Sequence, residues 1–189
     1  MTQLNRMVLI FAFLTISCFA RAERATKPSL SHLSEKRRAA FEHQIVKEFE
    51  EAMIGIGERP GDKLVTPLPL RGPVRRCDGN EIYILDGAEV RVKSADGTVG
   101  PDLLAAGSGG MPLSIYASKP GSPEFKKIFD QSVLNFYGTI KTNGRNQGCP
   151  EFSVEMHGSY LGRVGHQSGK MKITYDVRSK SYGNFPIKK

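Results

Sequence analysis

The apolar positions between residues 31 and 56 recur with the spacing of one face of a helix. The repeat places an apolar residue every four positions, and its members are Phe41, Ile45, Phe49 and Met53, with Ala52 and Ile56 widening the stripe. Charged residues occupy the other faces, and Ser31 or Ser34 can cap the first turn. We therefore predict an amphipathic helix that begins near one of these serines and ends at the glycines that follow Ile54.

From residue 77 onward, apolar and polar residues alternate with the period of two that is typical of strands. The run 81–85 is followed by Asp86-Gly87 and then by the alternating run 88–93, which is the signature of a two-residue hairpin. We predict that this hairpin exposes one of its faces to solvent. Asp96-Gly97 predicts a second turn, and residues 113–117 predict a short strand.

Further elements are expected in the second half of the chain. Ser122-Pro123-Glu124 has the pattern of a helix start, and a short helix there would share one face among Phe125, Ile128 and Phe129. Alternation then predicts a strand over residues 133–143, with one side made up of Leu134, Phe136 and Ile140. The runs 152–156 and 171–177 also alternate, and we expect these two strands to pair with each other.

Prolines separate the helix from the strands. The segment 57–76 contains Pro60, Pro67, Pro69 and Pro73, which exclude both a helix and a central strand, so we predict an extended strap. Because such a strap offers few backbone hydrogen bonds, we expect the helix to be attached less firmly than the sheet. The polar residues before the helix should form a flexible lead. The chain is thus divided into residues 1–22, 23–56, 57–76 and 77–189.

The first 22 residues have the pattern of a secretory signal peptide. Arg6 precedes the uncharged run 8–20, and Ala20 and Ala22 are small residues at the −3 and −1 positions of a cleavage site. Alternatively, Cys18 is the lipid-attachment site of a lipoprotein, although Thr15 stands where a branched aliphatic residue is preferred. We expect cleavage after Ala22, a periplasmic or secreted protein, and no later membrane-spanning segment.

Loss of the signal peptide would leave Cys77 and Cys149 as the remaining cysteines. In an oxidising compartment such a pair forms a disulfide, which over this loop would remove on the order of 4 kcal/mol of unfolded-state entropy. Two free buried thiols are the alternative. The alternating runs and frequent turns favour an α+β fold. We expect an N-terminal amphipathic helix plus a disulfide-linked antiparallel β domain, built as a small barrel or sandwich.

The positive charge of the chain is concentrated at its C-terminal end. Residues 23–162 contain equal numbers of basic and acidic residues, whereas the basic residues after Gly162 are opposed only by Asp176. Strand alternation puts Lys170 and Lys172 on the solvent side, and Tyr182 should be an exposed aromatic residue nearby. We predict an anion-binding face made up of Arg163, Lys170, Lys172, Arg178, Lys180 and Tyr182.

The partner of such a face would be anionic. An envelope component, namely a lipid headgroup or an acidic polysaccharide, or an acidic protein surface fits this charge. Nucleic acid fits less well in this compartment. A C-terminal region that is charged only for solubility is the alternative interpretation.

One stretch resembles a catalytic motif without completing it. Ser108 lies between glycines as in a nucleophile elbow, but that motif belongs at a strand-to-helix turn. Pro112 prevents an immediate helix here. We therefore do not assign a catalytic role to this serine.

The histidines also lack a specific pattern. His157 and His166 could be combined with Glu155 or Asp176, but the spacing is not that of a metal site, and catalytic zinc sites use three protein ligands. We expect no metal and no cofactor. The sequence favours a non-enzymatic, exported binding module, and a small secreted hydrolase or toxin is the alternative.

Overall fold

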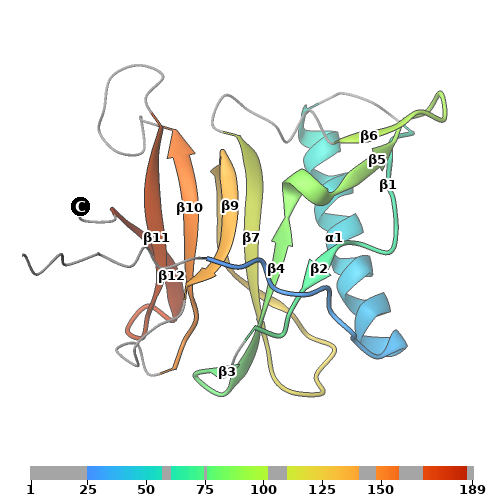
Figure 1. Cartoon of the computed structure of the whole chain (residues 1–189). Coiled ribbons are helices and arrows are strands. Elements are labelled where there is room, and N and C mark those ends of the chain that lie inside the picture. Colours follow the sequence, from blue (N-terminus) through green and yellow to red (C-terminus); the bar gives the residue numbers. More distant parts are fainter. Residues whose placement is uncertain are drawn as a thin grey trace, which may run out of the picture.

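A computed structural model describes residues 25–56, 61–74, 76–101, 110–140, 148–157 and 168–186. These residues form antiparallel strands in three sheets and a helix, α1 (Glu35–Ile56) (Figure 1). We name the sheets central, outer and small. The central sheet has the order β2-β4-β7-β8, with β3 also paired to β4. Its strands are β2 (Leu70–Arg71), β3 (Arg76–Cys77), β4 (Asn80–Asp86), β7 (Met111–Ser118) and β8 (Lys126–Val133).

The outer sheet follows the central sheet in the chain, whereas the strands of the small sheet alternate with the central strands. The outer sheet has the order β12-β11-β10-β9, and its strands are β9 (Asn135–Ile140), β10 (Glu151–His157), β11 (Ser168–Asp176) and β12 (Ser181–Pro186). The small sheet has the order β1-β5-β6, with β1 (Lys63–Leu64), β5 (Arg91–Lys93) and β6 (Val99–Pro101).

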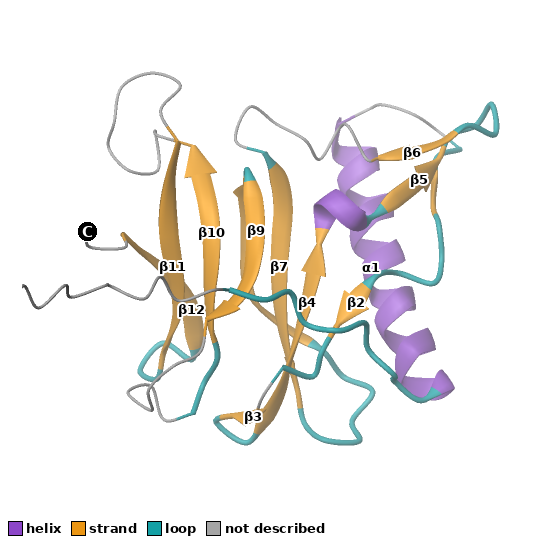
Figure 2. Cartoon of the chain, in the orientation of Figure 1, coloured by secondary structure: helices purple, strands orange, loops and turns teal. Residues whose placement is uncertain are grey.

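The central sheet is covered on both faces. Ile82 and Ile84 of β4 pack in one hydrophobic cluster with the outer sheet, whereas Tyr83 and Leu85 pack in a second cluster with α1. The layers are therefore outer sheet, central sheet and helix (Figure 2). Because neighbouring positions of β4 face two different cores, residues 82–86 are all buried, and residues 82–85 form a continuous apolar run.

The outer and central sheets share one core, and no closed barrel forms among the described strands. The predicted pairing of residues 152–156 with 171–177 is confirmed, since Phe152 lies opposite Ile173. The predicted disulfide is also confirmed. Cys77 of β3 is bonded to Cys149, just before β10, with a Cα–Cα distance of 4.5 Å, so the bridge links the two sheets.

Helix α1 is held to the central sheet by its apolar face. Phe41 is 1% exposed and meets the rings of Tyr116 and Phe125 at centroid distances of 5.2 and 5.0 Å. Polar contacts add to this packing, because the Lys127 ammonium lies 2.6 Å from a Glu48 carboxylate oxygen. These contacts argue against the loose attachment expected from the proline-rich strap. In the described part of the chain, no helix is long and apolar enough to cross a membrane.

The segment before the helix is not a flexible lead where the structure describes it. Thr26 exchanges two backbone hydrogen bonds with Thr139 of β9, at 3.1 and 2.9 Å. Further along, the Ser31 amide donates to the Leu70 carbonyl at 2.8 Å. The Lys27 ammonium also lies 2.8 Å from the buried carboxylate of Asp86. The segment therefore joins the edges of the outer and central sheets.

The predicted hairpin at Asp86-Gly87 is wrong. Asp86 ends β4 and caps a 3-10 helix (Gly87–Glu89), after which β5 joins the small sheet instead of pairing with β4. Strand β4 pairs with β2, β3 and β7 instead. Because both faces of the central sheet are covered, β4 is not half solvated. The second Asp-Gly prediction holds, because Gly97 has a φ of +89° in the turn between the paired strands β5 and β6.

The short helix predicted after Ser122 is also wrong, because this segment leads into β8. The register of β7 against β8 shifts so that Ile128 has no residue opposite it, which is a β-bulge. Ile128 and Phe129 consequently both enter the core shared by the two sheets, while Phe125 joins the cluster below α1. The spacing that resembles a helix face therefore comes from an irregular strand that contacts two cores.

The strand predicted over residues 133–143 is divided. β8 ends at Val133, β9 begins at Asn135, and the chain passes from the central to the outer sheet between them. Leu134 is consequently 36% exposed, whereas Phe136 and Ile140 are buried as predicted. Residues 141–143 lie outside the described residues.

Candidate binding site

Three turns meet at one end of the two facing sheets and surround a cleft. They connect β3 to β4, β7 to β8, and β11 to β12, and all three lie at the lower end of the molecule in Figure 1. We call this space, of about 480 Å³, the sheet-end cleft. Its lining consists of Asp78, Gly79, Asn80, Ala117, Lys119, Pro120, Lys126, Ile128, Tyr175 and Lys180.

Each turn has the local chemistry that its shape requires. Asp78 and Gly79 have φ values of +50° and +76° between the paired residues Cys77 and Asn80, as a two-residue hairpin demands. In the second turn, Pro120 and Gly121 follow Lys119, whose carbonyl accepts a hydrogen bond from the Ser122 amide at 3.0 Å. Proline followed by a glycine with positive φ is the pattern of a type II turn.

The third turn, between β11 and β12, is also fixed by hydrogen bonds and ends at Lys180. Asp176 accepts hydrogen bonds from the Arg178 amide at 2.9 Å and from the Ser179 hydroxyl at 3.0 Å. Lys180 then has a φ of +51° before β12 begins. The turn thus ends in a left-handed residue whose side chain reaches the cleft.

The cleft carries an excess of positive charge. Three lysines line it, namely Lys119, Lys126 and Lys180, against the single carboxylate of Asp78. Lys180 approaches this carboxylate at 4.0 Å, and both side chains are largely exposed, so the pair neutralises little charge. Within the described residues, Lys119 and Lys126 form no ion pair. Two ammonium groups at the cleft are therefore not matched by a carboxylate of the described chain.

The rest of the lining is mostly carbon. Ala117, Pro120, Ile128 and Tyr175 supply apolar surface between the lysines. Tyr175 also packs edge-on against Tyr182, with ring centroids 5.3 Å apart. Burial, together with the charges of Asp78 and Asp176, raises the pKa of Tyr175 above its usual value. Its hydroxyl is therefore neutral and able to donate a hydrogen bond at neutral pH.

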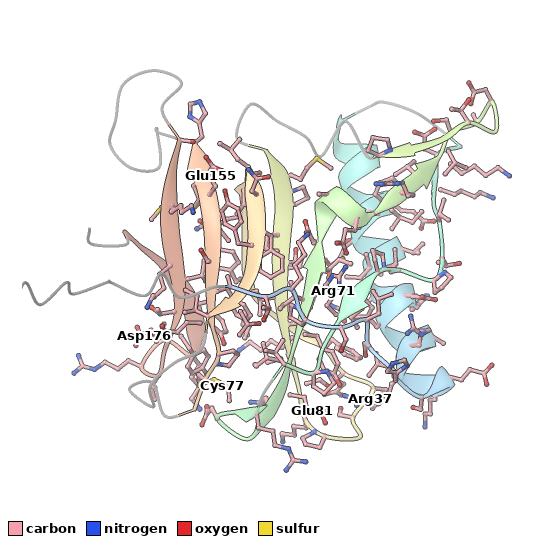
Figure 3. All side chains as sticks on the ribbon, viewed as in Figure 1. Arg37, Arg71, Cys77, Glu81, Glu155 and Asp176 are labelled. Atoms are coloured by element: carbon pink, nitrogen blue, oxygen red, sulfur yellow. A yellow bond between two sulfur atoms is a disulfide. The ribbon has the colours of Figure 1, made fainter. Side chains whose placement is uncertain are left out.

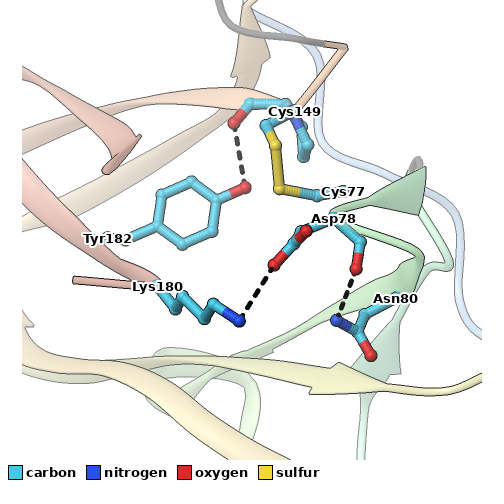
Figure 4. The surroundings of a disulfide bond; sticks show 7 residues. Cys77, Asp78, Asn80, Cys149, Lys180 and Tyr182 are labelled. Atoms are coloured by element: carbon cyan, nitrogen blue, oxygen red, sulfur yellow. Dashed lines mark hydrogen bonds and ion pairs between the residues drawn. A yellow bond between two sulfur atoms is a disulfide. The ribbon is translucent and has the colours of Figure 1, made fainter. Parts of the chain in front are cut away.

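The disulfide lies near Asp78 and Lys180, two of the residues that line the cleft (Figure 4). Cys77 immediately precedes Asp78, so the covalent link holds the β3–β4 turn against the outer sheet. Tyr182 is drawn next to the bridge, and its hydroxyl donates to the Pro150 carbonyl at 3.0 Å. Tyr182 is only 6% exposed, so the expectation that it adds exposed aromatic surface is wrong.

The described residues of the predicted basic face lie at two places on the outer sheet. Lys170 and Lys172 lie on β11, with Lys172 ion-paired to Glu151 at 2.9 Å. Arg178 and Lys180 belong to the β11–β12 turn, at the end of β11 that carries Asp176. Arg163 lies outside the described residues. Of the predicted residues, only Lys180 lines the sheet-end cleft, and the binding role of the others stays a prediction.

A carboxylate lies beside Lys170 of the predicted basic face. Glu155 lies opposite Lys170 in the strand register and accepts hydrogen bonds from Ser168, from Tyr137 at 2.7 Å and from Asn135 at 2.8 Å. These bonds lower the pKa of Glu155 to about 2. Lys170 in turn stands over the Tyr137 ring, 5.0 Å from its centroid. Its positive charge is thus balanced locally.

The histidine hypothesis gains no geometric support from the described residues. Glu155 and Asp176 lie at opposite ends of the outer sheet (Figure 3). They therefore do not share a site. No group of three His, Cys, Asp or Glu residues suited to a metal occurs in the described ranges. His166 and Ser108 lie outside those ranges.

Sequence reasoning missed most of the cleft. Lys119, Lys126 and Tyr175 were not among the predicted binding residues. The turn between β7 and β8 could have been found from Lys119-Pro120-Gly121, but that pattern does not say what the turn faces. Comparisons with protein-family models, with curated proteins and with solved structures found no match.

Proposed function

We propose that this protein is an exported, non-enzymatic binding module that holds an anionic ligand in the sheet-end cleft. The observation that supports this function is the set of three lysines around a concave site that contains one carboxylate. Positive charge in a cleft raises the local concentration of anions more than the same charge on a flat surface. The proposal keeps Lys180 from the predicted basic face and replaces the others by Lys119 and Lys126.

The surrounding structure supports a rigid site. The three turns are fixed by hydrogen-bonded turn geometry, and the disulfide joins two of the sheets beside them. A preformed site loses little conformational entropy when a ligand binds. Export through a signal peptide at residues 1–22 remains part of the proposal, and it would place the site in the periplasm or outside the cell.

The test is retention of the oxidised protein on a sulfated polysaccharide, heparin, as a function of salt. The cleft variant carries Lys119→Gln, Lys126→Gln and Lys180→Asn. Asparagine is chosen at position 180 because it tolerates the positive φ there. We expect the variant to elute at lower salt, because three positive charges that attract heparin are gone. Salt elutes the protein because exposed charges are screened within about 8–10 Å at physiological ionic strength.

The matched control removes the same charge elsewhere. It carries Lys36→Gln, Lys63→Gln and Lys93→Gln, three exposed lysines on α1 and the small sheet. If the cleft is the binding site, this control elutes close to the unchanged protein. Equal shifts for both variants would mean that retention reports net charge alone, and the proposed site would be rejected.

A further inference from the structure

The sheet-end cleft is larger and more apolar than a site for a simple inorganic anion needs to be. At about 480 Å³ it falls in the range of small-molecule sites, roughly 300–1,000 Å³. Four of its lining residues present carbon surface, including the partly buried ring of Tyr175. The lysines therefore account for one part of a ligand, and the apolar wall has to contact another part.

Asp78 is the residue that an anion site does not explain. A carboxylate repels an anion, yet its turn places it among the three lysines. At neutral pH a carboxylate only accepts hydrogen bonds, so its natural ligand partner is a hydroxyl group. Asn80 stands beside it and donates one amide hydrogen to the Asp78 carbonyl at 3.0 Å. That bond orients the amide, which keeps a second hydrogen and an acceptor oxygen for a ligand.

The exposed residues of the lining are not those expected of a site that binds a lipid headgroup in a bilayer. The exposed lining residues are Asp78, Gly79, Lys119, Pro120, Lys126 and Lys180, none of which has a large apolar side chain. Ile128 is buried, and Tyr175 is partly buried against Tyr182. No exposed lining residue therefore supplies a large apolar side chain that could enter a membrane around a headgroup.

From these observations we propose that the sheet-end cleft binds an acidic saccharide. The lysines hold its carboxylate, sulfate or phosphate group. Asp78 and Asn80 bind its hydroxyls, and Tyr175 contacts the sugar ring. This inference rests on the proposed function, because it names the chemical class of the anion that the same cleft takes.

The first experiment compares ligands of equal charge. Glucuronate is paired with acetate, and glucose 6-phosphate is paired with inorganic phosphate, each titrated into the oxidised protein at constant ionic strength and followed by NMR. We expect each sugar to bind about tenfold more tightly than its simple partner, since one or two added hydrogen bonds correspond to roughly that factor. Plain glucose tests the need for the acidic group and should bind more weakly than either sugar acid.

The outcomes separate the two proposals. If acetate and phosphate bind as tightly as the sugars, and the lysine variant abolishes this binding, the saccharide inference is wrong while the anion-binding function stands. If none of the ligands binds, and heparin retains the lysine variant as strongly as the unchanged protein, both proposals are rejected. Glucose binding as tightly as glucuronate would also overturn the inference, because the lysines would then have no role.

The second experiment uses Asp78→Asn, which removes the carboxylate but keeps a residue that tolerates the φ of +50°. For an acidic saccharide site, the variant binds phosphate more tightly, because a repulsive charge is gone. Its preference for glucose 6-phosphate over phosphate falls by about fivefold, because a hydroxyl loses a charged acceptor.

The matched control for this experiment is Asp96→Asn, in the β5–β6 turn of the small sheet. It makes the same charge change away from the cleft and should leave the preference unaltered. If Asp78→Asn strengthens the binding of sugar and phosphate equally, Asp78 does not bind a hydroxyl, and the saccharide inference fails.

Discussion

The guanidinium of Arg37 on α1 lies 3.0 Å from the carboxylate of Glu81 on β4. The same group donates to the Ser122 carbonyl at 2.7 Å and stands 5.6 and 5.5 Å from the ring centroids of Tyr83 and Phe125. Both partners of the ion pair are at most 16% exposed. One arginine thus connects the helix to two strands and a turn (Figure 3).

Replacement of this arginine should weaken the whole fold. We expect Arg37→Gln to lower the free energy of unfolding by about 2–4 kcal/mol, because Glu81 would keep a largely buried charge without its ion-pair partner. The exposed neighbour supplies the control, and Lys36→Gln should change stability by no more than about 0.5 kcal/mol. Denaturant unfolding followed by circular dichroism measures both, and a loss below 1 kcal/mol for Arg37→Gln would show that the contact is dispensable.

Removal of the helix tests the predicted domain division, in which the β domain folds without the helix. A chain that begins at Arg71 would expose Tyr83, Tyr116 and Phe125, which now pack below α1. We expect this chain to lose its cooperative thermal transition even when the disulfide is formed. A chain that begins at Ala25 keeps the helix and should retain the transition in scanning calorimetry. Cooperative unfolding of the shorter chain would restore the division at residues 57–76.

The N-terminal segment should detach when Gly138 acquires a side chain. Gly138 has a φ of +114°, and a Cβ there would clash with the backbone of Thr26. We expect Gly138→Ala to destabilise the protein by about 1–3 kcal/mol through strain and lost contacts. The amides of Thr26 and Thr139 should exchange faster with solvent, because their paired hydrogen bonds would break.

Gly97→Ala separates backbone strain from the clash. Gly97 also has a positive φ, of +89°, but a Cβ there meets no atom within 4 Å. This variant should therefore leave the exchange of the Thr26 and Thr139 amides unchanged. Hydrogen exchange read by NMR distinguishes the two cases, and unchanged protection in Gly138→Ala would contradict a close approach of the segment.

Glu155 should make stability depend on pH in the acid range. Hydrogen bonds from Ser168, Tyr137 and Asn135 lower its pKa from 4.5 to about 2 in the folded protein. Between these two values the unfolded chain takes up the proton first, so the contribution of Glu155 is present above pH 4.5 and is lost as the pH falls toward 2. We expect the stability difference between the unchanged protein and Glu155→Gln to shrink over this range.

Denaturant unfolding at pH 6, 4 and 2.5 measures this difference. Glu50→Gln, on the exposed side of α1, controls for the change in net charge. A difference for Glu155→Gln that is the same at all three pH values would mean that the hydrogen bonds do not perturb the carboxylate.

The three Asp-Gly pairs show how well this local pattern predicts hairpin turns. Asp78-Gly79 and Asp96-Gly97 form turns between paired strands, and the first of these was not predicted. Asp86-Gly87 has the same local signature but forms no hairpin. Its aspartate is 2% exposed and paired with Lys27, a residue 59 positions away. A contact that distant overrides the turn preference, and no local pattern contains it.

The segment after Ser122 was misread for a related reason. A bulge at Ile128 and the passage of the strand between two cores produce the spacing of a helix face. The spacing of apolar residues is reliable only where one face meets one core, as along α1 with Phe41 and Ile45. It fails where neighbouring residues of a strand face different layers.

The sequence by itself determined the features that depend on near neighbours or on composition. These are the periodic helix segment, the paired strands of the outer sheet, the Asp96-Gly97 turn and the single cysteine pair that bridges the sheets. Only the tertiary structure decided that the central sheet is covered on both faces, and that Lys119, Lys126 and Lys180 meet around Asp78 and Tyr175. These residues lie in turns or at strand ends far apart in the chain, and they converge because the two sheets pack face to face. Such packing depends on the summed burial of many side chains and leaves no periodic signal at the turns themselves.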